Sequence, residues 1–212
     1  MRSDPLILGF DTSAAHCAAA LLSGDTLLAQ AQEDMARGQA EALVPMLERV
    51  LRDGGADWRD LAALAVGVGP GNFTGIRISV ATARGLALAL QIPAIGVSVF
   101  EARACGLPRP LIVAEDARRG AVYLQGFGAA PDTPCMMAAE DVPLAPGTPV
   151  TGTAAQLLDG ATVLQPGIPL AEAIARVGRQ KLGQASLPRP APLYIRPADA
   201  TPPPEQPPPL LP

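Results

Sequence analysis

The chain has 212 residues, of which 49% are hydrophobic, 17% charged and only 3% aromatic, and its formal net charge is −4. This length and apolar content suffice for an aliphatic, alanine-rich core without disulfides or structural metals, and they exclude disorder of the chain as a whole. A protein that binds nucleic acid by itself normally carries a basic face, so the acidic balance argues against that activity for the isolated chain.

Histidine and cysteine are too sparse for several kinds of active site. The single histidine, His16, excludes a zinc site with two or three histidine ligands within one chain, and no Gly-x-Ser-x-Gly turn accompanies it. No Cys-x-x-Cys pair exists, so neither a zinc ribbon nor a thioredoxin-type site can form. Free thiols indicate a reducing compartment; the cysteines are Cys17, Cys105 and Cys135.

The hydrophobic segments are short. The first apolar run stops at Asp11, too early for the apolar region of a signal peptide. Residues 80–95 are the most apolar later stretch, but Arg84, Gln91 and Pro93 interrupt them before about 18 apolar residues accumulate. We therefore predict a cytoplasmic protein that does not span a membrane.

Short apolar runs bounded by turn residues predict strands, and apolar residues at helical spacing predict helices. The expected strands are 6–10, 17–22, 26–32, 61–68, 94–97, 111–114 and 121–127. The expected helices are 41–52, 76–90, 154–158 and 170–182. The first three strands form a meander, with Asp11, Thr12 and Ser13 in its first turn. Pro45 must lie in the first turn of its helix or kink it.

The composition changes after residues 107–110, where Leu-Pro-Arg-Pro is followed by a Pro- and Gly-rich half with short elements. We place a boundary here, which divides the chain into an N-terminal lobe, 1–105, and a smaller C-terminal lobe, 106–199. Residues 200–212 are proline-rich and are predicted to be disordered or polyproline II, without a core of their own.

Two segments invite a phosphate-binding interpretation. A strand that ends in Asp11-Thr12-Ser13 resembles the first phosphate loop of actin-like ATPases and sugar kinases, although these residues are also ordinary turn formers. Gly69 to Gly75 precede a helix, and helix N-termini bind anions. This loop lacks the Gly-Lys-Ser/Thr of a Walker A sequence, so a rigid glycine turn explains it equally well. Asp11, Thr12 and Ser13 are therefore candidate cofactor-binding residues of a vestigial phosphate loop.

Small residues recur along the second long helix. Ala81, Gly85 and Ala89 are spaced by four and share one face, which lets another backbone approach closely. That backbone belongs either to the chain's own sheet or to a partner. The helix carries only Arg77 and Arg84 as charges, so more of its surface is apolar than one sheet-facing side requires.

Two polar features receive no firm role from the sequence. Asp116-Ala117-Arg118 lies in the expected turn between two strands, where it forms either a local ion pair or an element that a partner recognises. His16 adjoins apolar Cys17, and a lone histidine of this kind is more often structural than catalytic.

Several segments, taken in order, resemble the bacterial TsaB family. They are 8–13 (LGFDTS), 41–45 (EALVP), 69–77 (GPGNFTGIR), 81–87 (ATARGLA), 116–120 (DARRG), 122–123 (VY) and 192–196 (PLYIR). The similarity runs from about Leu6 to Asp199, and the glycine-rich segment is its most specific part. The resemblance implies a non-catalytic subunit of the machinery that makes N6-threonylcarbamoyladenosine beside the anticodon of tRNA.

The same resemblance implies an α/β fold of two ribonuclease-H-like lobes of the actin-like ATPase superfamily, with mixed sheets flanked by helices and a degenerate second lobe. It implies two partners, the catalytic paralogue TsaD and the P-loop ATPase TsaE, with tRNA bound only through the complex and no cofactor. We expect the two long helices to pack side by side as the partner surface, which would also let the isolated chain form homodimers. The expected contact residues are Glu41, Leu43, Leu47, Arg77, Ala81, Gly85 and Ala89.

Two departures from related sequences bear on the chemistry. The catalytic paralogue carries two metal-binding histidines four residues apart, and the matching positions here are Val99 and Arg103. Valine cannot ligate a metal and a guanidinium repels one, which removes the transferase chemistry. Many relatives have His-Ser-Glu before the first long helix, where this chain has Gln39-Ala40-Glu41.

The leading hypothesis is therefore a scaffold subunit. One rival is a small actin-like ATPase or kinase that uses Asp11 and the Gly69–Gly75 loop, and nucleotide turnover by the pure chain separates it from the scaffold. A second rival is a metallopeptidase, which the lack of histidine ligands nearly excludes.

Overall fold

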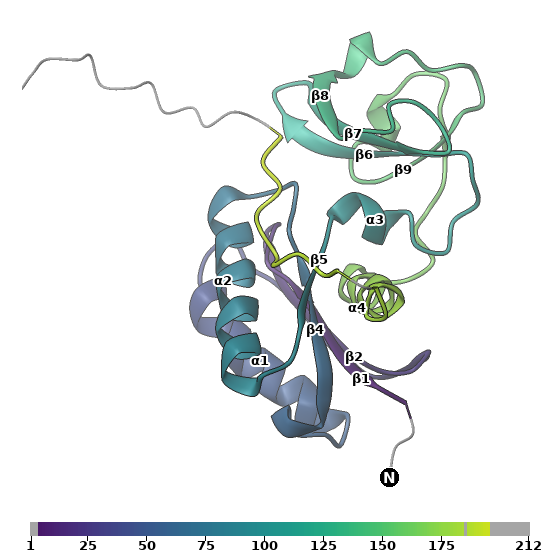
Figure 1. Ribbon diagram of the computed structural model, residues 1–212. Helices are drawn as coiled ribbons and strands as arrows, with labels where there is room; N and C mark the ends of the chain where they lie inside the picture. The colour runs from purple at the N-terminus through teal and green to yellow at the C-terminus, as the bar shows by residue number, and fades with distance from the viewer. Residues whose placement is uncertain (1–3, 185, 196–212) are drawn as a thin grey trace, which may run out of the picture.

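The computed structural model describes residues 4–184 and 186–195, which form two lobes, one above the other in Figure 1. The predicted tail, 200–212, and Arg196 lie outside the described residues. The first lobe contains a five-stranded sheet in the order β3-β2-β1-β4-β5. Its strands are β1 (Leu6–Asp11), β2 (His16–Ser23), β3 (Thr26–Asp34), β4 (Leu61–Gly67) and β5 (Ala94–Val97).

Helices cover both faces of this sheet. The strands β1, β2 and β3 form the predicted antiparallel meander, whereas β4 is parallel to β1 and β5 is parallel to β4. Successive side chains of a strand point to opposite faces. Accordingly, Leu8 and Phe10 pack in a core with α1 and α2, whereas Ile7 packs in a second core with α4. The helices are α1 (Gln39–Asp53), η1 (Trp58–Asp60), α2 (Phe73–Leu90) and α4 (Leu170–Lys181).

The second lobe has a sheet of the order β10-β9-β6-β7-β8 with only short helices around it. Its strands are β6 (Leu111–Arg118), β7 (Ala121–Phe127), β8 (Cys135–Ala138), β9 (Pro149–Thr151) and β10 (Thr162–Val163). The short helices of this lobe are η2 (Ala139–Asp141) and η3 (Ala155–Leu157), whereas α3 (Val99–Arg103) packs on α4 of the first lobe. Two mixed sheets flanked by helices, with a reduced second lobe, confirm the predicted fold class.

The predicted division at residues 105 and 106 assigns α4 to the C-terminal lobe, but α4 packs on the first lobe. Although α4 follows the second lobe in sequence, it packs on the sheet of the first lobe (Figure 1). A Cβ on Gly9 would lie 2.7 Å from the Ala171 carbonyl oxygen, so the glycine permits this close approach. The C-terminal lobe is therefore shorter than 106–199, because α4 belongs to the first lobe.

Local signals explain the other differences in element boundaries. Asn72 caps α2 by accepting a hydrogen bond from Gly75 N at 2.9 Å, so the helix begins at Phe73 and not at Ile76. Pro45 lies inside α1 and not in its first turn, where it removes one intrahelical hydrogen bond. The strand β6 continues to Arg118, and only a 3-10 turn forms within 154–158.

The sequence predicted no apolar stretch long enough to span a membrane, but one helix has the length and composition for it. By length and composition alone α2 could cross a bilayer, with a mean hydropathy of 1.3 and 28% of its length buried. The apolar segment expected from the sequence began at residue 80, whereas the apolar helix begins at Phe73. Core helices of other proteins have the same length and composition. In this fold α2 packs on the first sheet.

Candidate functional site

Asp11 is the centre of a hydrogen-bond network at the end of β1. Its side chain is fully buried, and Oδ1 accepts hydrogen bonds from Ser13 N and Ser13 Oγ, both at 2.9 Å. His16 Nε2 lies 2.9 Å from the same oxygen. Thr12 is also buried, and its Oγ1 donates to the Gly75 carbonyl at 2.7 Å. The polar side chains of the turn are thus hydrogen-bonded to other groups of the same chain. The exception is Asp11 Oδ2, which has no hydrogen-bond partner among the described residues.

The glycine-rich loop packs directly on this turn. Asn72 N donates to the Ser13 carbonyl at 2.6 Å. A Cβ on Gly71 would overlap the backbone of Ser13, one on Gly75 would overlap the backbone of Thr12, and one on Gly67 would overlap the Asp11 carboxylate. The glycines are required because two backbone segments approach each other closely, and the space beside them is filled.

This packing favours the ordinary-turn alternative over a phosphate loop at Asp11, Thr12 and Ser13. A phosphate site needs N–H groups and hydroxyls that point into open space. Here the Thr12 hydroxyl donates to the Gly75 carbonyl, the Ser13 hydroxyl donates to the Asp11 carboxylate, and both side chains are buried. The arrangement fits a structural clamp that joins β1, β4 and the start of α2.

The two positions that match metal ligands in the catalytic paralogue have structural roles. Val99 is buried, and its N–H donates to the Gly69 carbonyl at 2.8 Å. Arg103 Nε donates to Glu115 Oε1 at 3.0 Å, and Thr153 Oγ1 donates to the other oxygen of Glu115 at 2.8 Å. Within residues 4–184 and 186–195, no group of three or more His, Cys, Asp or Glu side chains is placed to hold a metal ion. Arg103 therefore ties α3 to the second lobe.

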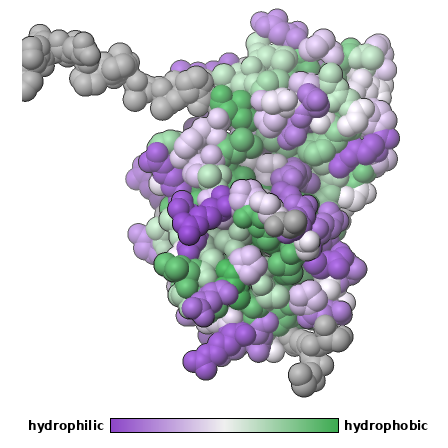
Figure 2. All heavy atoms as spheres, viewed as in Figure 1, coloured by the Kyte–Doolittle hydropathy of each residue, from purple (hydrophilic) through white to green (hydrophobic). Residues whose placement is uncertain are grey.

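The small-residue stripe lies on the outer face of α2. Ala81, Gly85 and Ala89 are all exposed, and nothing lies within 4 Å of the position that a Cβ on Gly85 would occupy. Leu88 is 82% exposed. Figure 2 shows apolar residues at the surface of the lower lobe among hydrophilic ones. The stripe is therefore open to another molecule and does not serve the internal packing that the sequence left as an alternative.

The helix α1 contacts α2 but presents different side chains from those expected. Leu43 and Leu47 are completely buried in the core of the first lobe, so they cannot touch a partner directly. Their spacing of four places them on the sheet-facing side of the helix. Glu41 is exposed, and the neighbouring Val44 is the large apolar residue of α1 that reaches the surface.

An exposed cluster at the start of α2 was not predicted. Phe73 and Tyr194 stack with their ring centroids 5.2 Å apart. The Arg77 guanidinium lies 3.7 Å from the Phe73 centroid, and Arg77 Nε donates to Tyr194 Oη at 2.9 Å. Tyr194 lies 117 residues after Arg77 in sequence, so no local pattern could pair them.

The Asp116-Ala117-Arg118 motif is a bulge at the end of β6 and not a loop with an ion pair. Asp116 Oδ1 accepts a hydrogen bond from Arg118 N at 2.6 Å, and Asp116 N donates to Thr153 Oγ1 at 2.9 Å. The carboxylate thus shapes the backbone of the turn, and the Arg118 side chain is exposed.

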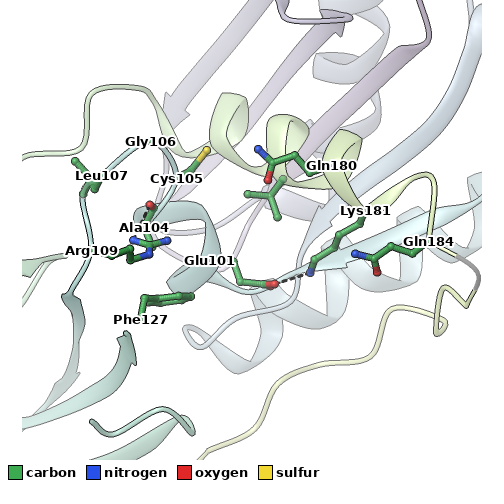
Figure 3. A pocket seen from close by; sticks show the side chains of 11 residues that line it. Glu101, Ala104, Cys105, Gly106, Leu107, Arg109, Phe127, Gln180, Lys181 and Gln184 are labelled. Atoms are coloured by element: carbon green, nitrogen blue, oxygen red, sulfur yellow. Dashed lines mark hydrogen bonds and ion pairs between the residues drawn. The ribbon is translucent and has the colours of Figure 1, made fainter. Parts of the chain in front are cut away.

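A hollow of about 410 Å³ lies where α3 and α4 meet the second lobe (Figure 3). Glu101 and Lys181 form an ion pair of 2.7 Å at its wall, and the Arg109 guanidinium lies 4.7 Å from the Phe127 centroid. Burial raises the pKa of the Cys105 thiol, so this side chain is not an activated nucleophile near neutral pH. None of the site residues expected from sequence lines this hollow.

The paired mixed sheets and the strand–turn–strand at Asp11 give this protein the fold of the actin-like ATPase superfamily. A family model described as "TsaD: tRNA N6-adenosine threonylcarbamoyltransferase" matches residues 29–135, half of the chain. The chain belongs to this family, and its named relatives place it with the TsaB proteins.

Three relatives illustrate the similarity. The chain is 39% identical over 122 residues to the tRNA threonylcarbamoyladenosine biosynthesis protein TsaB of Escherichia coli, a match that covers 55% of this chain and 52% of that protein. It is 34% identical over 171 residues to an uncharacterised protein of Mycobacterium tuberculosis, covering 79% of each. The solved structure of YeaZ from Pseudomonas aeruginosa superposes with a TM-score of 0.73 and 26% identity, covering 90% of this chain and 100% of that one. The match thus spans about half the length of the curated TsaB protein of E. coli.

Proposed function

We propose that this chain is a non-catalytic partner subunit in the formation of N6-threonylcarbamoyladenosine beside the anticodon of tRNA. The reaction is supported by relatives that are named for the biosynthesis of this nucleoside. The single observation that carries the non-catalytic part is the filled clamp: Gly67, Gly71 and Gly75 leave no space between themselves and the turn from Asp11 to Ser13. Val99 and Arg103 in place of metal ligands support the same conclusion.

We propose that the catalytic paralogue TsaD docks on α1 and α2 through two matching helices, and that the ATPase TsaE joins this assembly. The outward stripe of Ala81, Gly85 and Ala89 supports close approach by another helix. Exposed Leu88 and Val44 supply apolar area of the kind found in interface cores. The same face would let the isolated chain associate with a second copy.

We propose that the isolated chain binds tRNA only weakly and that the complex holds the tRNA, in the cytoplasm. The net charge of −4 disfavours independent binding to a polyanion. The three cysteines of the chain are free thiols, which supports a reducing compartment.

Co-expression of the full chain with the catalytic paralogue from the same host tests this proposal. We expect one complex of both chains on size-exclusion chromatography, and restored N6-threonylcarbamoyladenosine in cells depleted of their own subunit. Separate elution of the two chains, together with no restoration of the modified nucleoside, would refute the proposal.

A small ATPase or kinase is the second candidate function, favoured by one observation. The buried oxygen Oδ2 of Asp11 has no partner among the described residues, and an unpaired buried carboxylate oxygen is costly. However, this oxygen faces Gly67 so closely that no Cβ fits between them.

A further inference from the structure

Two long stretches of this chain contain no acidic residue. The sequence contains 20 Asp and Glu residues, yet residues 61–100 and 173–195 contain none. These ranges hold α2, β5 and the segment 186–195, which runs beside β5 and α2 in Figure 1. Leu193 N donates to the Val68 carbonyl at 2.8 Å and anchors the segment there.

The charges that are exposed in these ranges are positive. Arg77, Arg84 and Arg189 are exposed, and among the described residues no carboxylate lies within 4 Å of any of them. A protein with a net charge of −4 thus exposes three arginines without a carboxylate partner, and each of them can attract an anion.

Two aromatic rings lie beside one of these arginines, Arg77. The rings belong to Phe73 and Tyr194, which are 47% and 48% exposed. Arg77 is held beside both rings by its stack on Phe73 and by its Nε bond to Tyr194 Oη. Its terminal nitrogens make no hydrogen bond within residues 4–184 and 186–195, so the guanidinium is oriented and still has free donors. We call Phe73, Arg77 and Tyr194 the aromatic surface.

We propose that the aromatic surface binds unpaired nucleotides of RNA. An unstacked base would lie on the exposed ring of Tyr194 or Phe73, and its phosphate would accept hydrogen bonds from Arg77. Aromatic rings flanked by arginine are the means by which proteins hold single-stranded RNA, because every base has a stacking face. This inference rests on the proposed function, in which the assembled complex presents a tRNA anticodon loop to this subunit.

The chemistry favours RNA over a protein partner at this spot. A protein interface buries its aromatic anchors in pockets of the partner or receives anchors into its own. Phe73 and Tyr194 stack on each other with about half of each residue exposed, so the rings present a platform to another molecule. Residues 61–100 and 173–195 contain no carboxylate that would repel the phosphate backbone of RNA.

Photo-crosslinking to a 17-nucleotide anticodon stem-loop with 4-thiouridine in its loop tests the inference. The full chain is irradiated with this RNA alone at about 50 mM salt, where phosphate contacts are strong, and again in the presence of the catalytic paralogue. We expect crosslinked peptides that contain Phe73 or Tyr194 in both mixtures. Crosslinks confined to the second lobe, or none in either mixture, would overturn the inference.

Variants measure the contribution of each group by fluorescence anisotropy with the same RNA. Phe73→Leu and Tyr194→Leu should weaken binding about tenfold, whereas Tyr194→Phe, which keeps the ring, should stay within about twofold of the parent. Arg119→Ala and Leu157→Ala are controls, because both residues are exposed on the second lobe. Thermal melting confirms that each variant is folded.

The outcome is separable from that of the proposed function. Capture of the paralogue is measured by pull-down, and RNA contact is measured on the isolated chain, so either can fail alone. If Phe73→Leu and Tyr194→Leu abolish capture of the paralogue but leave RNA affinity unchanged, the aromatic surface is a protein contact and the inference is wrong.

Discussion

Gly67 and Asp11 lie so close together that no side chain fits at position 67, because a Cβ there would overlap Oδ2 of Asp11. They are the last residues of the parallel neighbours β4 and β1. The carboxylate therefore fills the end of the sheet, where open α/β folds usually bind their ligands.

Gly67→Ala should destabilise the protein by about 1–3 kcal/mol, since the added methyl group must displace the Asp11 side chain or the backbone. Gly85→Ala is the matched control. Gly85 lies within α2 with open space around it, so alanine should raise stability by roughly 0.5–1 kcal/mol through its better helix propensity. Urea denaturation measures both changes, and similar effects from the two substitutions would contradict the clamp.

Gly85→Leu should block association with the catalytic paralogue while the melting temperature stays within a few degrees of the parent. The outer face of α2 has room for the side chain in the isolated protein, but a helix packed against the stripe does not tolerate it. Gly167→Leu provides the control, because that exposed glycine also has nothing within 4 Å. Pull-down and melting are measured on the same preparations. If Gly85→Leu still captures the paralogue as the parent does, the interface lies elsewhere on the protein.

The isolated chain should hydrolyse no ATP above background, with or without Mg²⁺. Asp11→Ala should lower stability by about 1–3 kcal/mol, because Ser13 and His16 lose their shared acceptor within a buried turn. Phosphate release and thermal melting measure the two effects. Metal-dependent turnover that copurifies with the chain and disappears in Asp11→Ala would favour the ATPase alternative.

Stability should fall as the pH rises from about 9 to 11, partly because of Cys17. Burial, with a smaller contribution from Glu33, raises the pKa of this thiol from 9.0 to about 11. In that range the unfolded chain loses the Cys17 proton while the folded chain keeps it, which favours unfolding by up to roughly 2–3 kcal/mol. Below pH 9 both states are protonated and the group has no effect.

Denaturation of the parent and of Cys17→Ala at pH 8, 9, 10 and 11 isolates this contribution from the titration of other groups. The variant should lose less stability than the parent across the series. Parallel curves for the two proteins would show that Cys17 does not titrate in this way.

The elements of the first lobe follow closely from local sequence. Leu43, Met46, Leu47 and Val50 repeat with the helical period, and the apolar runs at β1, β4 and β5 are bounded by turn residues. Boundaries were missed where a side chain adjusts the backbone, as Asn72 does at the start of α2. The second lobe was less predictable, because its short strands β8, β9 and β10 have few residues from which a period can be read.

The sequence by itself determined the alternation of strands and helices and the lack of a Walker lysine, because these depend on residue type and near neighbours. It also has Val99 and Arg103 at the positions where the resemblance implies metal ligands in the paralogue. Only the tertiary structure decided which faces are covered. It placed Leu43 and Leu47 inward, turned Ala81, Gly85 and Ala89 outward, and returned α4 to the first sheet. It also brought Tyr194 to Arg77 across 117 residues of sequence. The physical reason is that burial and close approach depend on what packs on an element, and a helix of apolar and small residues suits the core and the surface equally well.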